Sequence, residues 1–540
     1  MSTKTSRKEA IFIPVVIFLL VFSTRLVDIN KPAEMWDEIT SYVVGLQFYY
    51  NIANLDFNPD SWKISAHPPI ARYMFGAANG IYVFSNIGFE LFSLGQTDSI
   101  KILHDLKNFV PGRLTSAFFA SFTAVLIFIL TRKFINTKTG IIASFILAFS
   151  PAFLAYSRLA QPDAITIFFY TLSVSLFLIA IKENKYKYYM LSAISTGLTL
   201  GSKLNTATLF ILLPLIFFVY NKDKLRKLNL IGYVKLIILP LVAIFTFYIT
   251  WPRIWTNTIA NFLETIELQS FVSTSPEYFL GGLDHPFYYY ATHFIVGTPV
   301  FLLLLLIPAG AYIHKNRDKF HVSLILWIIV HLAIFSFSIL KQTGIKNTLV
   351  AYPALAIIAS LGVVYLADRL KPYMKNKSIH IVGGIVLAYL IATAYLMHPY
   401  YLDYYNEAVG GPKNVYENRL FAFGSLGEGI SEAADYLNEN KNGTIQFYVM
   451  PRHVIPTHNL QEINSYVPDY LIENGIVENT TDNNIWIMRG IVPVADYLVE
   501  NTNYRWYIDP GFHQAISNDY KLIHTVEVQG APLAWIYEKN

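Results

Sequence analysis

The chain has 540 residues, of which 54% are hydrophobic and only 14% are charged, whereas soluble globular proteins average roughly 25% charged residues. Its mean hydropathy of +0.39 is typical of a membrane protein. It contains no cysteine, which excludes disulfide bonds, thiolate metal sites and cysteine nucleophiles. The formal net charge of +4 is too small to indicate a nucleic-acid partner, and none is expected.

Eleven apolar stretches follow one another along the chain. They are residues 11–27, 112–130, 140–156, 164–181, 188–201, 206–220, 231–251, 291–313, 320–340, 348–366 and 379–397. Each approaches the roughly 20 residues that a helix needs to cross a bilayer, the fifth and sixth being the shortest. We therefore expect an α-helical polytopic protein of the cell membrane with about eleven transmembrane helices.

The polar connections between these stretches are alternately rich and poor in Lys and Arg. The rich segments contain Lys4, Arg7, Lys8; Arg132, Lys133, Lys138; Lys182, Lys185, Lys187; Lys222, Lys224, Arg226, Lys227; Lys315, Arg317, Lys319; and Arg369, Lys371, Lys375, Lys377. Because cytoplasmic loops carry the excess of Lys and Arg, the N-terminus is predicted inside and the C-terminus outside. The first stretch lacks a small-residue cleavage site, which favours an uncleaved anchor.

Three long polar segments fall on the predicted outer side. Residues 28–111 form the first outer loop, with interfacial helices expected at 39–53, 69–84 and 89–94, and residues 252–290 form the second. Residues 399–540 predict a separate extracytoplasmic mixed α/β domain, large enough to bury a core. Its expected elements are a helix at 431–439 and strands at 445–450, 486–488, 504–508 and 524–528. Residues 1–398 are then the transmembrane domain.

The first outer loop contains two short runs that could carry chemistry. One is Trp-Asp-Glu at 36–38, where Asp37 could simply cap the helix that follows. The other is His-Pro-Pro-Ile-Ala-Arg at 67–72, where the prolines suit the first turn of a helix. Helix geometry alone does not explain why His67 and Arg72 flank that turn.

Further charged residues lie at the outer ends of the apolar stretches. They are Arg113, Arg158, Asp163, Lys203, Lys341 and Lys346. Each cation alone could be an interfacial residue with its charge in the headgroup layer. A set of cations at one membrane face is what the phosphate or pyrophosphate of a lipid requires. A carboxylate among them would suit a general base.

Together, these motifs resemble those of the membrane C-type glycosyltransferases that use polyprenyl-phosphate sugars, in particular protein O-mannosyltransferases and lipid A aminoarabinose transferases. Residues 37–38 resemble the acidic pair of that family, and 67–72 are similar to a mannosyltransferase His-Pro-Pro-Leu-Gly-Lys run. The remaining similar segments are 111–114, 157–163, 341–353, 398–411 and 427–429. Asn347-Thr348 departs from an Arg-Tyr found in many members, and His67 departs from the Glu-Lys of the aminoarabinose branch.

The resemblance implies an inverting transfer of a sugar, in the mannosyltransferase manner, from a dolichyl or undecaprenyl phosphate carrier to a hydroxyl. It implies Asp37 as the general base, with Glu38 and Asp163 as further catalytic candidates. The implied substrate-binding residues are His67, Arg72, Arg113, Arg158, Lys203, Lys341, Lys346 and His285. No cofactor is certain, although Glu38, His67, Asp284, His285 and His293 could ligate a divalent metal ion. Histidines in such positions are more often hydrogen-bonded structural groups.

Two other functions remain open from the sequence. A transporter or flippase should place its ionisable residues at mid-membrane on broken helices, whereas here they gather at one face. An oligosaccharide or glycolipid transferase of the same architecture should show a Trp-Trp-Asp type run in the outer domain, but Trp486, Trp506 and Trp535 are isolated there. The partners expected are the bilayer, a lipid-linked sugar and a protein, lipid or glycan acceptor.

Overall fold

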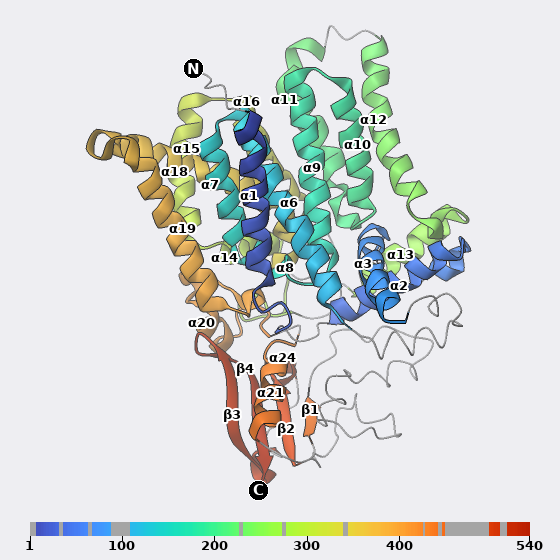
Figure 1. Cartoon of the computed structure of the whole chain (residues 1–540), viewed down its shortest axis with the longest axis vertical. Helices are drawn as coiled ribbons and strands as arrows, with labels where there is room; N and C mark the ends of the chain where they lie inside the picture. Colours follow the sequence, from blue (N-terminus) through green and yellow to red (C-terminus); the bar gives the residue numbers. More distant parts are fainter. Residues whose placement is uncertain are drawn as a thin grey trace.

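A bundle of long helices carries a small β-sheet at one end (Figure 1). This computed structural model describes residues 7–31, 36–62, 67–87, 108–225, 230–272, 277–337, 344–424, 427–440, 445–448, 496–507 and 516–540. The bundle helices are α1 (Arg7–Leu26), α6 (Val110–Phe134), α7 (Thr137–Phe149), α8 (Pro151–Tyr156), α9 (Pro162–Glu183), α10 (Tyr186–Leu200), α11 (Leu209–Leu225), α12 (Leu230–Ile249), α14 (Tyr289–Val296), α15 (Val300–Asn316), α16 (Lys319–Ser336), α17 (Gly344–Thr348), α18 (Tyr352–Met374) and α19 (Ser378–Met397).

Each predicted apolar stretch coincides with one of these helices or with a consecutive pair, apart from 338–340, which lie outside the described residues. By length and composition, the described part has six helices able to cross a membrane, or up to seven if α14 and α15 form one span bent by 103°. The protein is therefore a multi-pass helical membrane protein. The count of eleven crossings and the direction of the termini stay predictions.

The bend between α14 and α15 falls at Pro299, which starts the second helix and has no N–H to continue the first. The carbonyl groups freed by this bend are satisfied from the tail. Asn406 is fully buried, and its side-chain amide donates to the carbonyls of Ile295 and Thr298, at 2.8 Å each. Its backbone N–H donates to Val296, also at 2.8 Å. The start of the tail is thereby fastened to the bundle.

The first outer loop contains α2 (Trp36–Ala53), η1 (Pro59–Trp62) and α3 (Ile70–Ile87), so two of its three predicted helices are confirmed. The third, at 89–94, lies outside the described residues. Helices α2 and α3 pack with their backbones almost touching, because Gly45 and Gly76 face each other. A Cβ on Gly76 would stand 2.0 Å from the carbonyl oxygen of Gly45, so any side chain there would force the helices apart.

The second outer loop begins with η3 (Pro252–Ile254) and continues as α13 (Thr258–Val272). The loop joins the first outer loop through Arg253, which contacts Asp60 at 3.2 Å and also pairs with Glu264 on α13. The two loops therefore form one connected layer at the end of the bundle where α2 and α3 lie.

The tail contains η6 (Tyr401–Asp403), η7 (Glu407–Val409), α20 (Gly411–Glu417), α21 (Ile430–Asn440) and α24 (Thr502–Tyr507), with strands β1 (Ile445–Tyr448), β2 (Tyr497–Asn501), β3 (Tyr520–Val528) and β4 (Ala531–Lys539). The sheet order is β1-β2-β4-β3, with β1 parallel to β2 and the other pairs antiparallel. Residues of α21 and the sheet form one core, while Trp506, Ala531 and Leu533 belong to the core cluster of the bundle. The tail thus shares part of its core with the transmembrane helices.

The predictions for the tail are confirmed at α21, β1 and β3 and wrong at 504–508. The aromatic run there lies largely in α24, because a helical turn carries Arg505 back to Glu500, at 3.2 Å, and to the Tyr537 hydroxyl, at 2.9 Å. Strands β2 and β4 were not predicted, and 486–488 lie outside the described residues.

Glu500 provides a pH test of the tail. Burial raises the pKa of its carboxyl from 4.5 to about 7, although Arg505 opposes the shift. Between these two values the folded state keeps a proton that the unfolded state releases, so stability falls as pH rises from 4.5 to about 7. The full change is on the order of 3 kcal/mol. Melting temperatures of the purified chain across this range should fall more for the wild type than for Glu500→Gln. Parallel curves would contradict the prediction.

Candidate functional site

The acidic pair of the first outer loop lies in the first turn of α2. Asp37 is the second residue of that helix, and its side chain lies outside the described part. Glu38 is fully buried and forms a two-pronged ion pair with Arg113 at the start of α6, with N–O distances of 2.8 and 2.7 Å. The backbone N–H of Ala160 donates to the same carboxylate at 2.8 Å.

The third guanidinium nitrogen of Arg113 is also bound within the protein, because it donates to the carbonyl of Ile29 at 2.7 Å. The pair therefore ties together the chain after α1, helix α2, helix α6 and the connection between α8 and α9. Breaking a buried ion pair leaves an uncompensated charge, which makes such a pair a strong brace. This geometry favours a structural role for Glu38 and Arg113 over the catalytic and phosphate-binding roles predicted for them.

A second cluster surrounds Asp163 in the first turn of α9. The Lys203 ammonium lies 2.9 Å from one carboxylate oxygen, and the Lys346 ammonium lies 3.7 Å from the other. His67 is close enough to act on Asp163 electrostatically. All four residues were predicted for the site, and the fold brings them together from four separate segments. The cluster carries two lysines and one histidine for one buried carboxylate.

A chain of partly or fully buried hydrogen bonds fixes one wall of this cluster. Asn347 on α17 accepts from Lys203 at 3.3 Å and from Asn205 at 2.8 Å. The imidazole of His331 on α16 lies 2.7 Å from the Asn347 carbonyl. The chain then continues through the hydroxyls of Thr208 and Tyr170, at 3.3 and 3.2 Å. Asn347, which departs from the Arg of the resembling family, is thus held as an acceptor for Lys203 rather than supplying a charge.

Arg158 is 2% exposed and contacts no carboxylate in the described part of the chain. It donates to the carbonyls of Val27 and Asp28, and its guanidinium lies 5.3 Å from the ring centre of Tyr401. One of its nitrogens is 3.4 Å from His398. This arginine lies where the end of α1, the connection between α8 and α9, and the start of the tail meet.

Arg25, near the end of α1, is a second buried guanidinium that the sequence analysis missed. It is 0% exposed and donates to the Ser157 hydroxyl at 3.1 Å and to the Ala148 carbonyl. Arg158 is its electrostatic neighbour. A charged residue inside an apolar stretch was the available signal, since such residues are rare and functional by default. The two arginines together place buried positive charge at this end of the bundle, and neither forms an ion pair with a carboxylate of the described residues.

The other predicted site residues are distributed as follows. Arg72 is buried and joins α3 to α2 through the Ser41 hydroxyl. His285 contacts the Glu277 carbonyl at 3.1 Å, and Asp284 is exposed. His293 is buried among the rings of Phe279, Tyr289 and Phe421. Lys341 lies outside the described residues.

The predicted metal ligands do not assemble. In the described ranges, no group of three or more His, Asp or Glu side chains is arranged to hold a metal ion. Both Glu38 oxygens are already bound by Arg113, and His293 contacts aromatic rings instead of carboxylates. A divalent metal ion therefore stays a prediction.

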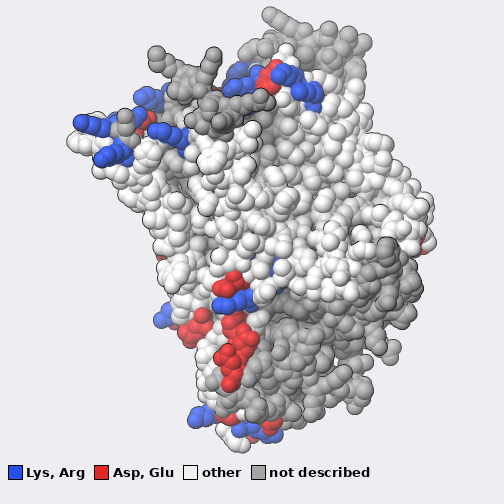
Figure 2. Space-filling model, viewed as in Figure 1, with Lys and Arg blue, Asp and Glu red and all other residues white. Residues whose placement is uncertain are grey.

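Helices α8, α14, α2 and α3 all lie at the end of the bundle nearest the sheet (Figure 1). Figure 2 shows that Lys and Arg on the visible face of the bundle gather mainly at the opposite end. The site cations are therefore buried groups at one end, while the exposed basic loops occupy the other. The predicted orientation depends on this same asymmetry.

One family model matches part of the chain. Residues 97–251 match the family model described as dolichyl-phosphate-mannose-protein mannosyltransferase. This segment is less than a third of the chain and includes Arg113, Arg158, Asp163 and Lys203. No curated protein matches the sequence.

Several solved structures are similar at low identity. ArnT from Cupriavidus metallidurans, solved bound to undecaprenyl phosphate, shares 13% identity with a TM-score of 0.48, covering 98% of each chain. The apo oligosaccharyltransferase of Archaeoglobus fulgidus shares 14% identity with a TM-score of 0.48, covering 96% of this chain and 74% of that one. Arabinosyltransferase EmbB from Mycobacterium smegmatis shares 13% identity with a TM-score of 0.40, covering 71% and 37%. Similarities this distant carry no conclusion about the activity of this protein.

The ion pair of α2 and α6 gives a direct test. Glu38→Ala leaves Arg113 buried without its counter-charge, which typically costs about 3–5 kcal/mol. We expect a large drop in melting temperature and in yield of folded protein, measured after purification in detergent. Glu417→Ala, which removes one partner of an ion pair whose two side chains are both more than half exposed, serves as the matched control and should change little. A Glu38→Ala protein of normal stability that has lost turnover would instead support a catalytic role for Glu38.

The sequence motifs resemble those of C-type glycosyltransferases of the polyprenyl-phosphate-dependent mannosyltransferase type. The family match confirms this resemblance over residues 97–251.

Proposed function

We propose that this protein is an inverting glycosyltransferase that moves a sugar from a polyprenyl phosphate carrier to an acceptor hydroxyl at the membrane face where the sheet lies. The family match over 97–251 supports this class of reaction. The transferred sugar would be a hexose, in the manner of the protein O-mannosyltransferases. The observation that carries the proposal is the buried positive charge of Arg25 and Arg158, which contact no carboxylate in the described part of the chain.

An unneutralised buried cation is costly unless an anion comes to it. A carrier phosphate arriving through the lipid would supply that anion, and arginine is suited to phosphate because its planar fork offers paired donors. Carbonyl groups and the ring of Tyr401 hold Arg158 in place, and no carboxylate of the described residues pairs with it directly. The residue is therefore pre-positioned, and its charge remains available for an incoming phosphate.

In the proposed reaction, Asp37 takes the proton of the acceptor hydroxyl as that oxygen attacks the anomeric carbon. The new glycosidic bond forms while the bond from that carbon to the phosphate oxygen breaks, and the polyprenyl phosphate leaves with the electron pair. Negative charge grows on the phosphate, so Arg158 and the cations near Asp163 would stabilise the transition state. Preorganised charges in a poorly solvated site usually make the largest contribution to such catalysis.

The cluster around Asp163 has a different proposed part. Lys203 and Lys346 flank the Asp163 carboxylate. In this proposal Asp163 holds both ammonium groups in position to contact the carrier phosphate. The two ammonium groups stabilise the charged form of this carboxylate, which makes it a poorer base than a carboxylate without such neighbours. We therefore assign Asp163 to positioning, and the proton transfer to Asp37.

The bend between α14 and α15 bears on the transporter alternative. Transporters use the backbone groups freed at broken helices to bind ions or substrates. Here Asn406 occupies the carbonyls of Ile295 and Thr298, and Val296 accepts from the Asn406 backbone. The carbonyl groups freed at the bend are consequently bound by the protein itself and are not available to a transported ion or substrate. This favours an enzyme over a transporter.

The carrier phosphate provides one test. Arg158→Ala should weaken use of a polyprenyl-phosphate sugar roughly 10- to 100-fold, because a charge-assisted hydrogen bond is worth about 1.5–3 kcal/mol. Arg158→Lys should restore little, since a point charge cannot reproduce the guanidinium fork. The matched control is Arg369→Ala, an exposed arginine of α18. Binding of the radiolabelled carrier and its turnover are both measured. Undiminished binding by Arg158→Ala would remove this residue from the phosphate site.

Asp37 provides the second test. Asp37→Asn keeps the shape of the side chain, and Asp37 lies in the first turn of α2 and not at its N-cap, so folding should change little. Loss of the general base should lower turnover by roughly 10²- to 10⁴-fold while donor binding is kept. The measurement is single-turnover transfer by purified protein, with melting temperature as the folding control. Near-normal transfer would leave Asp37 with a structural role in the first turn of α2.

A further inference from the structure

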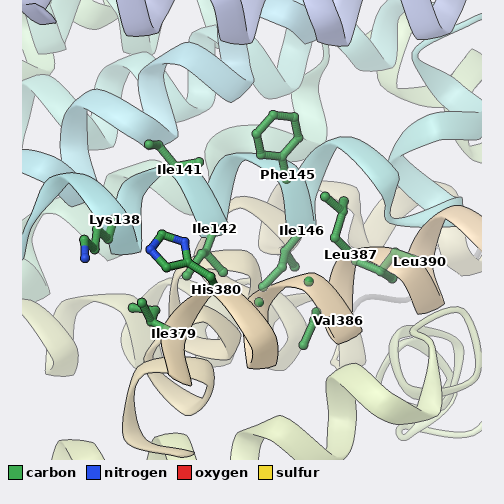
Figure 3. A pocket seen from close by; sticks show the side chains of 12 residues that line it. Lys138, Ile141, Ile142, Phe145, Ile146, Ile379, His380, Val386, Leu387 and Leu390 are labelled. Carbon is green, nitrogen blue, oxygen red and sulfur yellow. The ribbon is translucent and has the colours of Figure 1, made fainter. Parts of the chain in front are cut away.

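An open groove runs between α7 and α19 along the outside of the bundle, away from the residues discussed above. Its cavity volume is about 340 Å³, within the roughly 300–1,000 Å³ of ordinary ligand sites. The walls are aliphatic and aromatic, with Ile142, Phe145, Leu387 and Leu390 among them (Figure 3). Polar side chains come only at one end, where Lys138 and His380 lie near each other (Figure 3).

The groove exists because α19 has two consecutive glycines where side chains would otherwise fill it. A Cβ placed on Gly384 would meet nothing within 4 Å, and one on Gly383 would first meet Ile142 at 3.7 Å. Helix contact does not require these glycines, unlike Gly362, whose added Cβ would lie 2.2 Å from the Leu305 carbonyl oxygen. The space beside α19 is therefore an opening and not a close helix crossing.

Charge distinguishes the two ends of this groove. Lys138 lies in the first turn of α7 and His380 in the first turn of α19, and both side chains are exposed. Within the described ranges Lys138 makes no ion pair, and the exposed Lys375 and Lys377 immediately precede α19. The polar end of the groove thus opens at the basic end of the bundle (Figure 2). The end lined by Phe145 and Leu390 carries no charged side chain.

We propose that this groove binds one acyl chain of a glycerophospholipid whose anionic headgroup lies against Lys138 and His380. Hydrocarbon contact alone does not select among lipids, because the bilayer is as apolar as the groove. Charge at the mouth does select, since Lys and Arg near the surface attract anionic headgroups. The apolar walls of the groove then hold the acyl chain, and the Lys138 and His380 side chains at its polar end select the headgroup.

The lipid is distinct from the proposed sugar carrier. The cations assigned to the carrier phosphate, Arg25 and Arg158, lie near the end of α1 and the connection between α8 and α9, at the end of the bundle nearest the sheet. The groove mouth lies at the other end, where α7 and α19 begin. This inference therefore stands whether or not the proposed transferase activity is correct.

The test uses the purified full chain in nanodiscs that contain equal amounts of phosphatidylglycerol and phosphatidylcholine. The lipids retained after transfer to detergent are counted by native mass spectrometry. The wild type should retain one phosphatidylglycerol molecule in preference to phosphatidylcholine. Lys138→Ala with His380→Ala should reduce that preference by at least about fivefold, and Gly384→Phe should abolish retention of either lipid by filling the groove.

Two matched variants control for general effects. Gly310→Phe adds the same ring to another glycine, on α15, whose Cβ would meet nothing within 4 Å. Lys315→Ala removes an exposed lysine from the end of the same helix. Neither should change the retained lipid. Unchanged retention by Gly384→Phe, equal retention of the two headgroups by the wild type, or a preference for added undecaprenyl phosphate over phosphatidylglycerol would each overturn the proposal.

Discussion

The ion pair between Glu38 and Arg113 is the interaction on which the arrangement of the proposed site depends. The Glu38 carboxylate accepts from two nitrogens of Arg113 and from the backbone N–H of Ala160. These buried contacts of Glu38 fix α2 against α6 and against the connection that precedes α9. The same contacts position Asp37 and Asp163, since Asp37 lies in the first turn of α2 and Asp163 in the first turn of α9, directly after the connection that they hold. A buried pair is a costly way to gain stability, so its value here is geometric specificity.

The free-energy cost of burying a charge also explains how the cations are distributed. Cations at the basic end of the bundle are exposed to water, whereas Arg25 and Arg158 are buried with carbonyl and aromatic partners. The Asp163 cluster compensates only part of the positive charge around it. Such an arrangement is expensive without an anion and favourable with one, which is the physical basis of the proposed phosphate site. The apolar groove at the other end uses exposed cations, whose attraction for lipid headgroups is weaker and depends on salt.

Several elements could be predicted from local pattern alone. Apolar length predicted the helices of the bundle, and the amphipathic runs after residue 38 and at 69–84 predicted α2 and α3. Local pattern failed at 504–508, where an aromatic run suggested a strand. The contact between Arg505 and Glu500 decided for a helix there, and that contact depends on the packing of β2 against β4. Glu38 shows the same limit, because a carboxylate beside Asp37 looks catalytic until its partner at Arg113, far along the chain, is known.

The sequence by itself determined that the protein crosses a membrane several times, which residues are charged at the ends of its helices, and which family its central segment resembles. These features depend on composition and short spacing, which the chain carries regardless of how it folds. Only the tertiary structure decided which charges neutralise one another. It paired Glu38 with Arg113, gathered His67, Lys203 and Lys346 around Asp163, and left Arg25 beside Arg158. The reason is physical: the electrostatic role of a side chain depends on its distance to other charges and on its burial, and both are set by segments that are distant in the sequence.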